Sequence, residues 1–154
     1  MDMRVAVVGG GSWGTTVAHL TAHNASTVLH TRREDVAAAI NEQHMNRRYL
    51  DGYVLHSDLS ASTDLAAVVS KANVLVMGVP SSGFRQTLVD IRPHIRPRVP
   101  IVSLAKGFEI GSRKRMTQLV EEELPGHPVG VLTGPNLAKE ILGGSAAAAV
   151  LAFA

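Results

Sequence analysis

Short apolar runs alternate with segments in which apolar residues recur at helical spacing along most of the chain. A strand buried on both faces reads as a continuous apolar run, and a helix packed on one side shows the longer spacing. We therefore expect strands at 4–8, 26–30, 73–77, 101–104, 129–132 and 146–153, and helices at 15–23, 34–42, 63–69, 81–92, 112–123 and 137–142. This α/β alternation predicts a doubly wound, mostly parallel sheet with helices on both faces.

Residues 41–64 interrupt the alternation, because they are polar and irregular with few apolar anchors. So long a loop without structure is unusual in a compact domain. We expect it to be a functional excursion or to contain a short element that the pattern does not reveal. Ser81 is expected to cap the helix that follows it.

Gly9, Gly11 and Gly14 have the spacing G-x-G-x-x-G between the first strand and the first helix. The first glycine permits a tight turn, the second lets backbone approach a pyrophosphate, and the third lets helix and strand pack closely. The N-terminus of the following helix attracts an anion. The motif predicts a Rossmann-type dinucleotide-binding domain, in which Trp13 either packs or flanks the cofactor.

Arg32 and Arg33 follow the second strand, about where an NAD-selective fold carries an acidic residue. An acid repels a 2′-phosphate, whereas a guanidinium pairs with it and stacks on adenine. We therefore expect NADP(H) to be favoured, with NAD(H) possible. The alternative is that both arginines are solvated surface charges.

Lys106 directly follows the strand at 101–104 and precedes a glycine. Because ligands of such sheets bind beyond the carboxyl ends of the strands, Lys106 is expected to neutralise a phosphate or donate to a carbonyl oxygen. It is otherwise an exposed loop lysine. His19 and His23 stand four residues apart on a helix, but without a third ligand we expect no metal site.

Composition narrows the class of protein further. The chain has 154 residues, a formal charge of +2 and no cysteine, which excludes disulfides and thiolate chemistry. Its basic residues are dispersed without interleaved aromatic residues, so we expect no nucleic-acid partner. The first strand begins too early for a signal peptide, and no segment is apolar enough to span a membrane. These features predict a soluble, cytoplasmic protein with one domain over residues 1–154.

Five motifs occur in a fixed order: GGGSWGTTVA, NRRYL, VPSSGF, SLAKGFE and TGPNLAKEI. With them the chain resembles the N-terminal domain of bacterial NAD(P)-dependent glycerol-3-phosphate dehydrogenases. The resemblance implies an oxidoreductase that transfers a hydride reversibly between NAD(P)H and dihydroxyacetone phosphate to give sn-glycerol 3-phosphate, a precursor of phospholipids.

The resemblance also implies roles for individual residues. Asn136 departs from the bacterial pattern, which usually has serine or threonine there, and matches the eukaryotic one. The implied cofactor contacts are Gly9, Gly11, Ser12, Trp13, Gly14, Arg32, Arg33, Tyr49, Phe84, Lys106 and Ala138, and the implied substrate contacts are Lys106, Gly134 and Asn136.

In this family a helical second domain follows, with the catalytic lysine and much of the contact of a homodimer. We therefore expect no catalytic residue in this chain, and little activity from it alone, because hydride transfer needs a complete site. Two other interpretations stay open. The chain is either a free-standing NADP-binding or sensor module without catalysis, or part of a related sugar-acid dehydrogenase.

Overall fold

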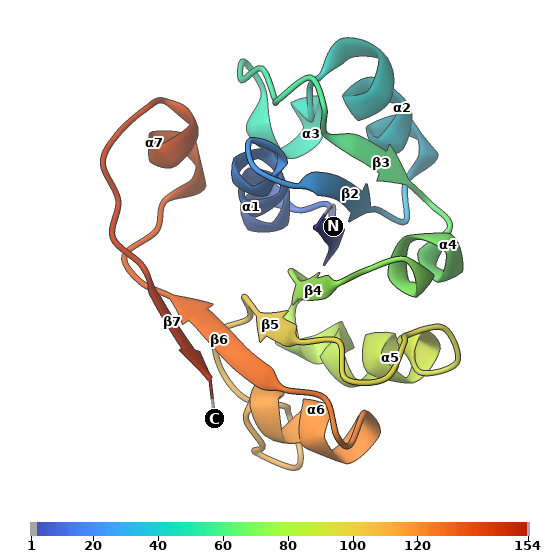
Figure 1. Ribbon diagram of the computed structural model, residues 1–154. Helices are drawn as coiled ribbons and strands as arrows, with labels where there is room; N and C mark the ends of the chain where they lie inside the picture. Colours follow the sequence, from blue (N-terminus) through green and yellow to red (C-terminus); the bar gives the residue numbers. More distant parts are fainter. Residues whose placement is uncertain (1–2, 154) are drawn as a thin grey trace.

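The computed structural model describes residues 3–153 and contains one mixed sheet (Figure 1). Six neighbouring strands are parallel, in the order β3-β2-β1-β4-β5-β6, and β7 pairs antiparallel with β6 at the edge. The strands are β1 (Arg4–Val8), β2 (Ser26–His30), β3 (Ser60–Ser62), β4 (Val74–Met77), β5 (Ile101–Ser103), β6 (Val129–Thr133) and β7 (Val150–Phe153). The predicted doubly wound fold is confirmed.

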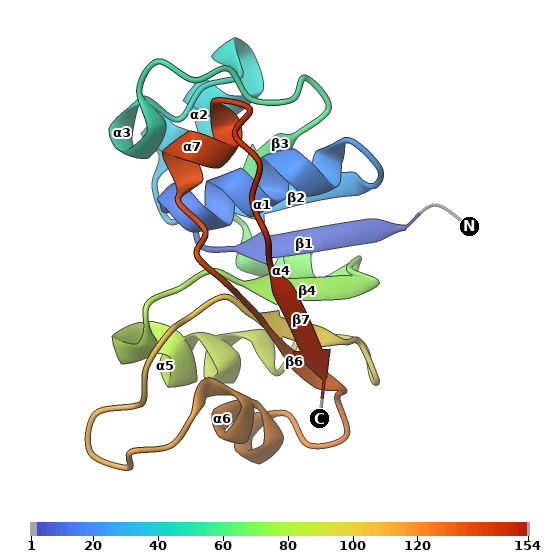
Figure 2. The same cartoon turned by 90° about the vertical axis from the view of Figure 1, so that its left-hand side faces the viewer.

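Helices cover both faces of the sheet (Figures 1 and 2). α4, α5 and α6 pack on one face, and α1 and α2 on the other, where α7 lies against α1. The helices are α1 (Ser12–Ala22), α2 (Glu34–Gln43), α3 (Arg47–Leu50), α4 (Leu65–Ser70), α5 (Ser81–Ile91), α6 (Met116–Glu123) and α7 (Ala138–Leu142). Within residues 3–153, none of these helices has the length and apolar character needed to cross a membrane.

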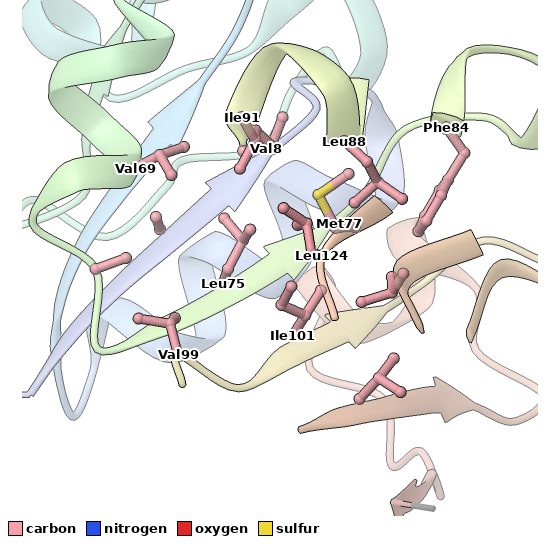
Figure 3. Packing of buried hydrophobic residues seen from close by; sticks show 14 of the residues in the cluster. Val8, Val69, Leu75, Met77, Phe84, Leu88, Ile91, Val99, Ile101 and Leu124 are labelled. Atoms are coloured by element: carbon pink, nitrogen blue, oxygen red, sulfur yellow. The ribbon is translucent and has the colours of Figure 1, made fainter. Parts of the chain in front are cut away.

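Alternation along the central strands divides the core into two layers. In β1, Val5 and Val7 face α1 and α2, whereas Ala6 and Val8 face α4 and α5. Figure 3 shows the second layer, in which Phe84 and other side chains of α5 lie over β4 and β5. Burial on both faces explains why these strands are continuous apolar runs.

Several predicted boundaries need correction. The irregular region 41–64 contains α3 and the edge strand β3, so the expectation of an unrecognised short element is confirmed. The expected cap on α5 is wrong, because Pro80 occupies the N-cap position and no side chain caps the helix. The helix predicted from residue 112 begins at Met116. Residues 108–115 instead form a hairpin-like turn, in which Arg113 adopts a positive φ of 58°.

The glycine turn is a contact between backbones. Gly9 has a φ of +120°, and a Cβ there would lie 2.5 Å from the carbonyl oxygen of Gly78. A Cβ on Gly14 would overlap the carbonyl oxygen of Gly9. By contrast, Gly11 has an ordinary φ of −74°, and the space beside it is open. Two of the predicted glycine roles, the tight turn and the close approach of helix to strand, are thus confirmed.

A network of ion pairs joins the hairpin-like turn to the helices beneath it. Arg85 on α5 donates from Nε to Oε1 of Glu109 at 2.7 Å and from Nη2 to Oε2 at 2.9 Å. The same guanidinium also pairs with Glu122 and Glu123 of α6. These hydrogen bonds from Arg85, with one from Ser112, lower the pKa of Glu109 from 4.5 to about 2.

Gly14, which contacts backbone, and Gly11, which faces open space, predict different effects of adding one methyl group. Gly14→Ala should lower the free energy of unfolding by about 1 to 3 kcal/mol, because the rigid backbone opposite cannot move aside. Gly11→Ala should leave it unchanged within about 0.5 kcal/mol, because its Cβ meets open space. Urea denaturation of both variants beside the parent chain tests this, and equal losses would contradict it.

Stability should depend on pH through Glu109. Because folding lowers the pKa of this carboxyl, the ionised group stabilises the folded state above pH 4.5 and loses that effect as the pH falls towards 2. Glu109→Gln should therefore lower the urea midpoint at pH 7, and the difference from the parent chain should shrink below pH 4.5. Glu121→Gln, a change of an exposed glutamate on α6 that takes no part in the network, is the control. A difference that is constant with pH would refute the assignment.

Candidate functional site

A cleft of about 790 Å³ opens at the carboxyl ends of the central strands. Loops after β1, β2 and β4 form most of it, so it lies where β1 separates the two halves of the sheet. This is the position at which doubly wound sheets bind ligands, and the volume suits a small organic molecule. The lining residues include Gly9, Gly10, Gly11, Ser12, Trp13, Gly14, His30, Thr31, Arg32, Arg33, Tyr49, Gly78, Val79, Pro80, Gly83, Gln86, Thr87, Asp90 and Ala105.

The N-terminus of α1 opens into the cleft. Gly11 is its N-cap, no side chain caps it, and its first turn contains no acidic residue. Uncapped N–H groups and the positive end of the helix dipole favour an anion there. The open space beside Gly11 lets a ligand approach the backbone, so these residues fit the diphosphate of a dinucleotide. Trp13 lines the cleft and also packs against the core, so its packing role is present and its contact with a cofactor stays a prediction.

The two arginines after β2 lie on the cleft together with Tyr49 of α3. Arg33 also forms a bidentate pair with Asp35, both N–O distances being 3.0 Å, and its hydrogen bonds lower the pKa of that carboxyl. Since both side chains are about half exposed, with 47% and 62% of their surface accessible, the pair is weak and can exchange for a ligand phosphate. The basic character predicted for this end of the cleft is present.

Asn46 explains how the NRRYL motif reaches the cleft. Its side chain is fully buried, and Nδ2 donates to the carbonyl oxygen of Gly10 at 3.0 Å and to Oγ1 of Thr15 at 2.9 Å. It therefore ties α3, and with it Tyr49, to the glycine turn. The sequence analysis missed this residue, because its partners are 31 and 36 positions away.

The structure brings Lys106 and the TGPN motif together. Lys106 is exposed, and Nζ donates to the carbonyl oxygen of Gly134 at 3.3 Å. Gly134 adopts a φ of +154°, and the amide nitrogen of Asn136 lies against it. Lys106 directly follows Ala105, which lines the cleft, so the cation lies at the mouth of the cleft, although Lys106, Gly134 and Asn136 are not part of its lining. Ala138, the first residue of α7, follows them and does not line the cleft.

Phe84 lies elsewhere. It is fully buried in the core, outside the lining of the cleft, so its contact with a cofactor stays a prediction while its packing role is evident. The opposite side of α5 faces the cleft instead, with Gly83, Gln86, Thr87 and Asp90. Helical spacing contains the signal that separates the two sides, because the apolar positions 84, 88 and 91 alternate with these polar ones.

Histidines occur at two further places, one on the cleft and one beside α1. His30 ends β2 and lines the cleft, and burial lowers its pKa, so it is neutral at pH 7. His19 and His23 meet His56, whose backbone N–H donates to Nδ1 of His19 at 2.9 Å. Burial, followed by the two neighbouring imidazoles, lowers the pKa of His19. Across residues 3–153, no three His, Cys, Asp or Glu side chains are arranged to hold a metal ion.

Known proteins share this sequence and fold. The profile of the NAD-dependent glycerol-3-phosphate dehydrogenase N-terminus matches residues 4–154. A glycerol-3-phosphate dehydrogenase (NAD(P)+) of Sphingopyxis alaskensis is 55% identical over the whole chain, and one of Mycobacterium avium is 53% identical over 99% of it. The chain spans 46% and 45% of these two relatives, that is, about half of each.

Solved structures agree with these relatives. A glycerol-3-phosphate dehydrogenase of Coxiella burnetii superimposes with a TM-score of 0.90 at 30% identity, and the match covers 99% of this chain and 47% of that protein. A ketopantoate reductase of Ralstonia eutropha, at 21% identity, shares the fold alone, with a TM-score of 0.68 over 85% of this chain and 41% of that one. The cleft, its glycine turn and these matches lead to one conclusion: the chain belongs to the family of NAD-dependent glycerol-3-phosphate dehydrogenase N-terminal domains.

Proposed function

We propose that this chain is the dinucleotide-binding domain of an enzyme that interconverts dihydroxyacetone phosphate and sn-glycerol 3-phosphate with NAD(P)(H). The observation that carries the proposal is the placement of Lys106 beside Gly134, at the mouth of a cleft whose floor is the glycine turn. Two of the motifs that carry the resemblance, SLAKGFE and TGPNLAKEI, thus meet next to the cleft, which supports a substrate site there. The relatives are named glycerol-3-phosphate dehydrogenases, which supports this substrate class.

Each part of the cleft has a distinct task in this proposal. The nicotinamide of the bound cofactor supplies or accepts the hydride. The N-terminus of α1 holds the diphosphate, and Arg32 and Arg33 hold the adenosine ribose end. Lys106 offers a cation to the substrate phosphate or a hydrogen bond to its carbonyl oxygen, whose developing charge it would stabilise. The amide of Asn136 is placed to donate a second hydrogen bond to the substrate.

The proposal extends to the rest of the protein. Because the chain spans about half of its relatives, we propose that a helical second domain supplies the catalytic lysine and much of a homodimer contact. Four large apolar side chains in the part of the chain after β6 are exposed, and this supports a second domain that covers them. They are Leu137, Val150, Leu151 and Phe153. A synthesis of phospholipid precursors in the cytoplasm is the role that this activity implies.

The activity is tested on the full-length protein. Dihydroxyacetone phosphate should drive oxidation of NADPH, whereas 6-phosphogluconate should drive no reduction of NADP+. Lys106→Met should lower kcat/KM for dihydroxyacetone phosphate by about 100-fold, the loss of one donor to a developing oxyanion. Activity on the sugar acid would favour a related dehydrogenase, and binding of NADPH without turnover of either substrate would favour a sensor module.

Preference for NADPH is tested by calorimetric titration of this chain with NADPH and NADH. The double variant Arg32→Ala, Arg33→Ala should weaken NADPH binding by about 1 to 3 kcal/mol, because charge-assisted hydrogen bonds to the 2′-phosphate are lost. Binding of NADH should change little. Arg47→Ala removes one positive charge outside the lining of the cleft and is the control. Equal losses for both nucleotides would refute the preference.

A further inference from the structure

The segment that carries Lys106 has no apolar anchor. Between Lys106 and Arg115 no residue is buried, and two large apolar side chains point outwards, Phe108 with 61% and Ile110 with 89% of its surface exposed. Burial of such side chains is what usually holds a loop against a domain. The segment must therefore be held by polar contacts.

The two residues of this segment that are half-buried and charged, Glu109 and Lys114, both belong to the ion-pair network. Arg85 donates two parallel hydrogen bonds to Glu109, and this bidentate geometry is the strongest for a guanidinium and a carboxylate. Lys114 pairs with Glu122, which Arg85 also contacts. A single arginine of α5 thus connects the turn with α6.

The network is balanced and partly shielded from water. Its three cations, Arg85, Arg92 and Lys114, face three carboxylates. The side chains of Glu109 and Glu123 expose only 18% and 16% of their surface. Pairs of this kind are screened less by salt than exposed ones, and networks exceed isolated pairs in effect.

A short stretch of backbone connects this network to Lys106. Glu109 lies three positions along the chain, and its backbone N–H donates to the carbonyl oxygen of Lys114 at 2.9 Å. On the other side of Lys106, Ala105 donates to Oγ of Ser103 at the end of β5, at 3.2 Å. Lys106 therefore lies between two hydrogen-bonded positions, Ala105 at the end of β5 and Glu109.

We propose that Arg85 is a positioning residue, which acts through Glu109 to hold the backbone of Lys106 at the mouth of the cleft. This rests on the role of Lys106 in the proposed function. Arg85 itself does not line the cleft. Lysine is a poor substitute for it, because an ammonium cannot reproduce the two parallel hydrogen bonds to Glu109.

The test is a double-mutant cycle of Arg85→Met and Lys106→Met in the full-length protein. Arg85→Met should lower kcat/KM for dihydroxyacetone phosphate by about 10- to 100-fold, as expected for a displacement near 1 Å. The Kd for NADPH should stay within about twofold, since the glycine turn is untouched. In the Lys106→Met background, Arg85→Met should have little further effect, because Lys106 is no longer there to be positioned.

Conservative and matched variants complete the test. Arg85→Lys should recover less than half of the lost kcat/KM, whereas Arg92→Ala, which removes a cation that pairs with Glu123 alone, should leave it unchanged. If Arg85→Met does not fold, Glu109→Gln replaces it in the cycle. A full effect of Arg85→Met without Lys106 would overturn the positioning proposal. An unchanged kcat/KM in Lys106→Met alone would instead overturn the proposed function of Lys106.

Discussion

The structure depends on a contact in which three segments of the backbone meet without side chains between them. Gly9 and Gly14 stack against Gly78, whose N–H donates to the carbonyl oxygen of Val8 at 2.7 Å. This contact sets the distance between α1 and the ends of β1 and β4. Because the helix stands so close, its uncapped N-terminus points into the cleft, and any Cβ at Gly9 or Gly14 would push it away. The electrostatics of the cleft thus follow from a steric constraint.

The sheet forms the rigid core of the domain and also carries the loops of the cleft at one end. Central strands are apolar on both faces, so they are locked between two layers of helices, while their carboxyl ends carry the loops that form the cleft. The edge is different. β7 turns back antiparallel beside β6 (Figure 2). Its side chains are exposed. The cleft therefore lies at one end of the sheet, and exposed apolar side chains lie along one edge.

Side-chain hydrogen bonds position two segments beside the cleft. The α3 segment is fastened to the glycine turn by the buried amide of Asn46, and the turn after Lys106 is fastened to α5 by Arg85. Both tethers act between a functional loop and a rigid element. Such contacts specify position through direction and distance, which apolar packing of an exposed loop does not provide.

The sequence by itself determined the alternation of six strands with six helices, the glycine turn and the family, because each depends on spacing between near neighbours. It missed α3 and β3, which are too short to show a periodic pattern. Tertiary structure alone decided that β7 runs antiparallel and that Asn46 and Arg85 are tethers. The partners of these two side chains lie 24 to 38 positions away. Local periodicity records burial within one element, but such distant pairings exist only once the elements have packed.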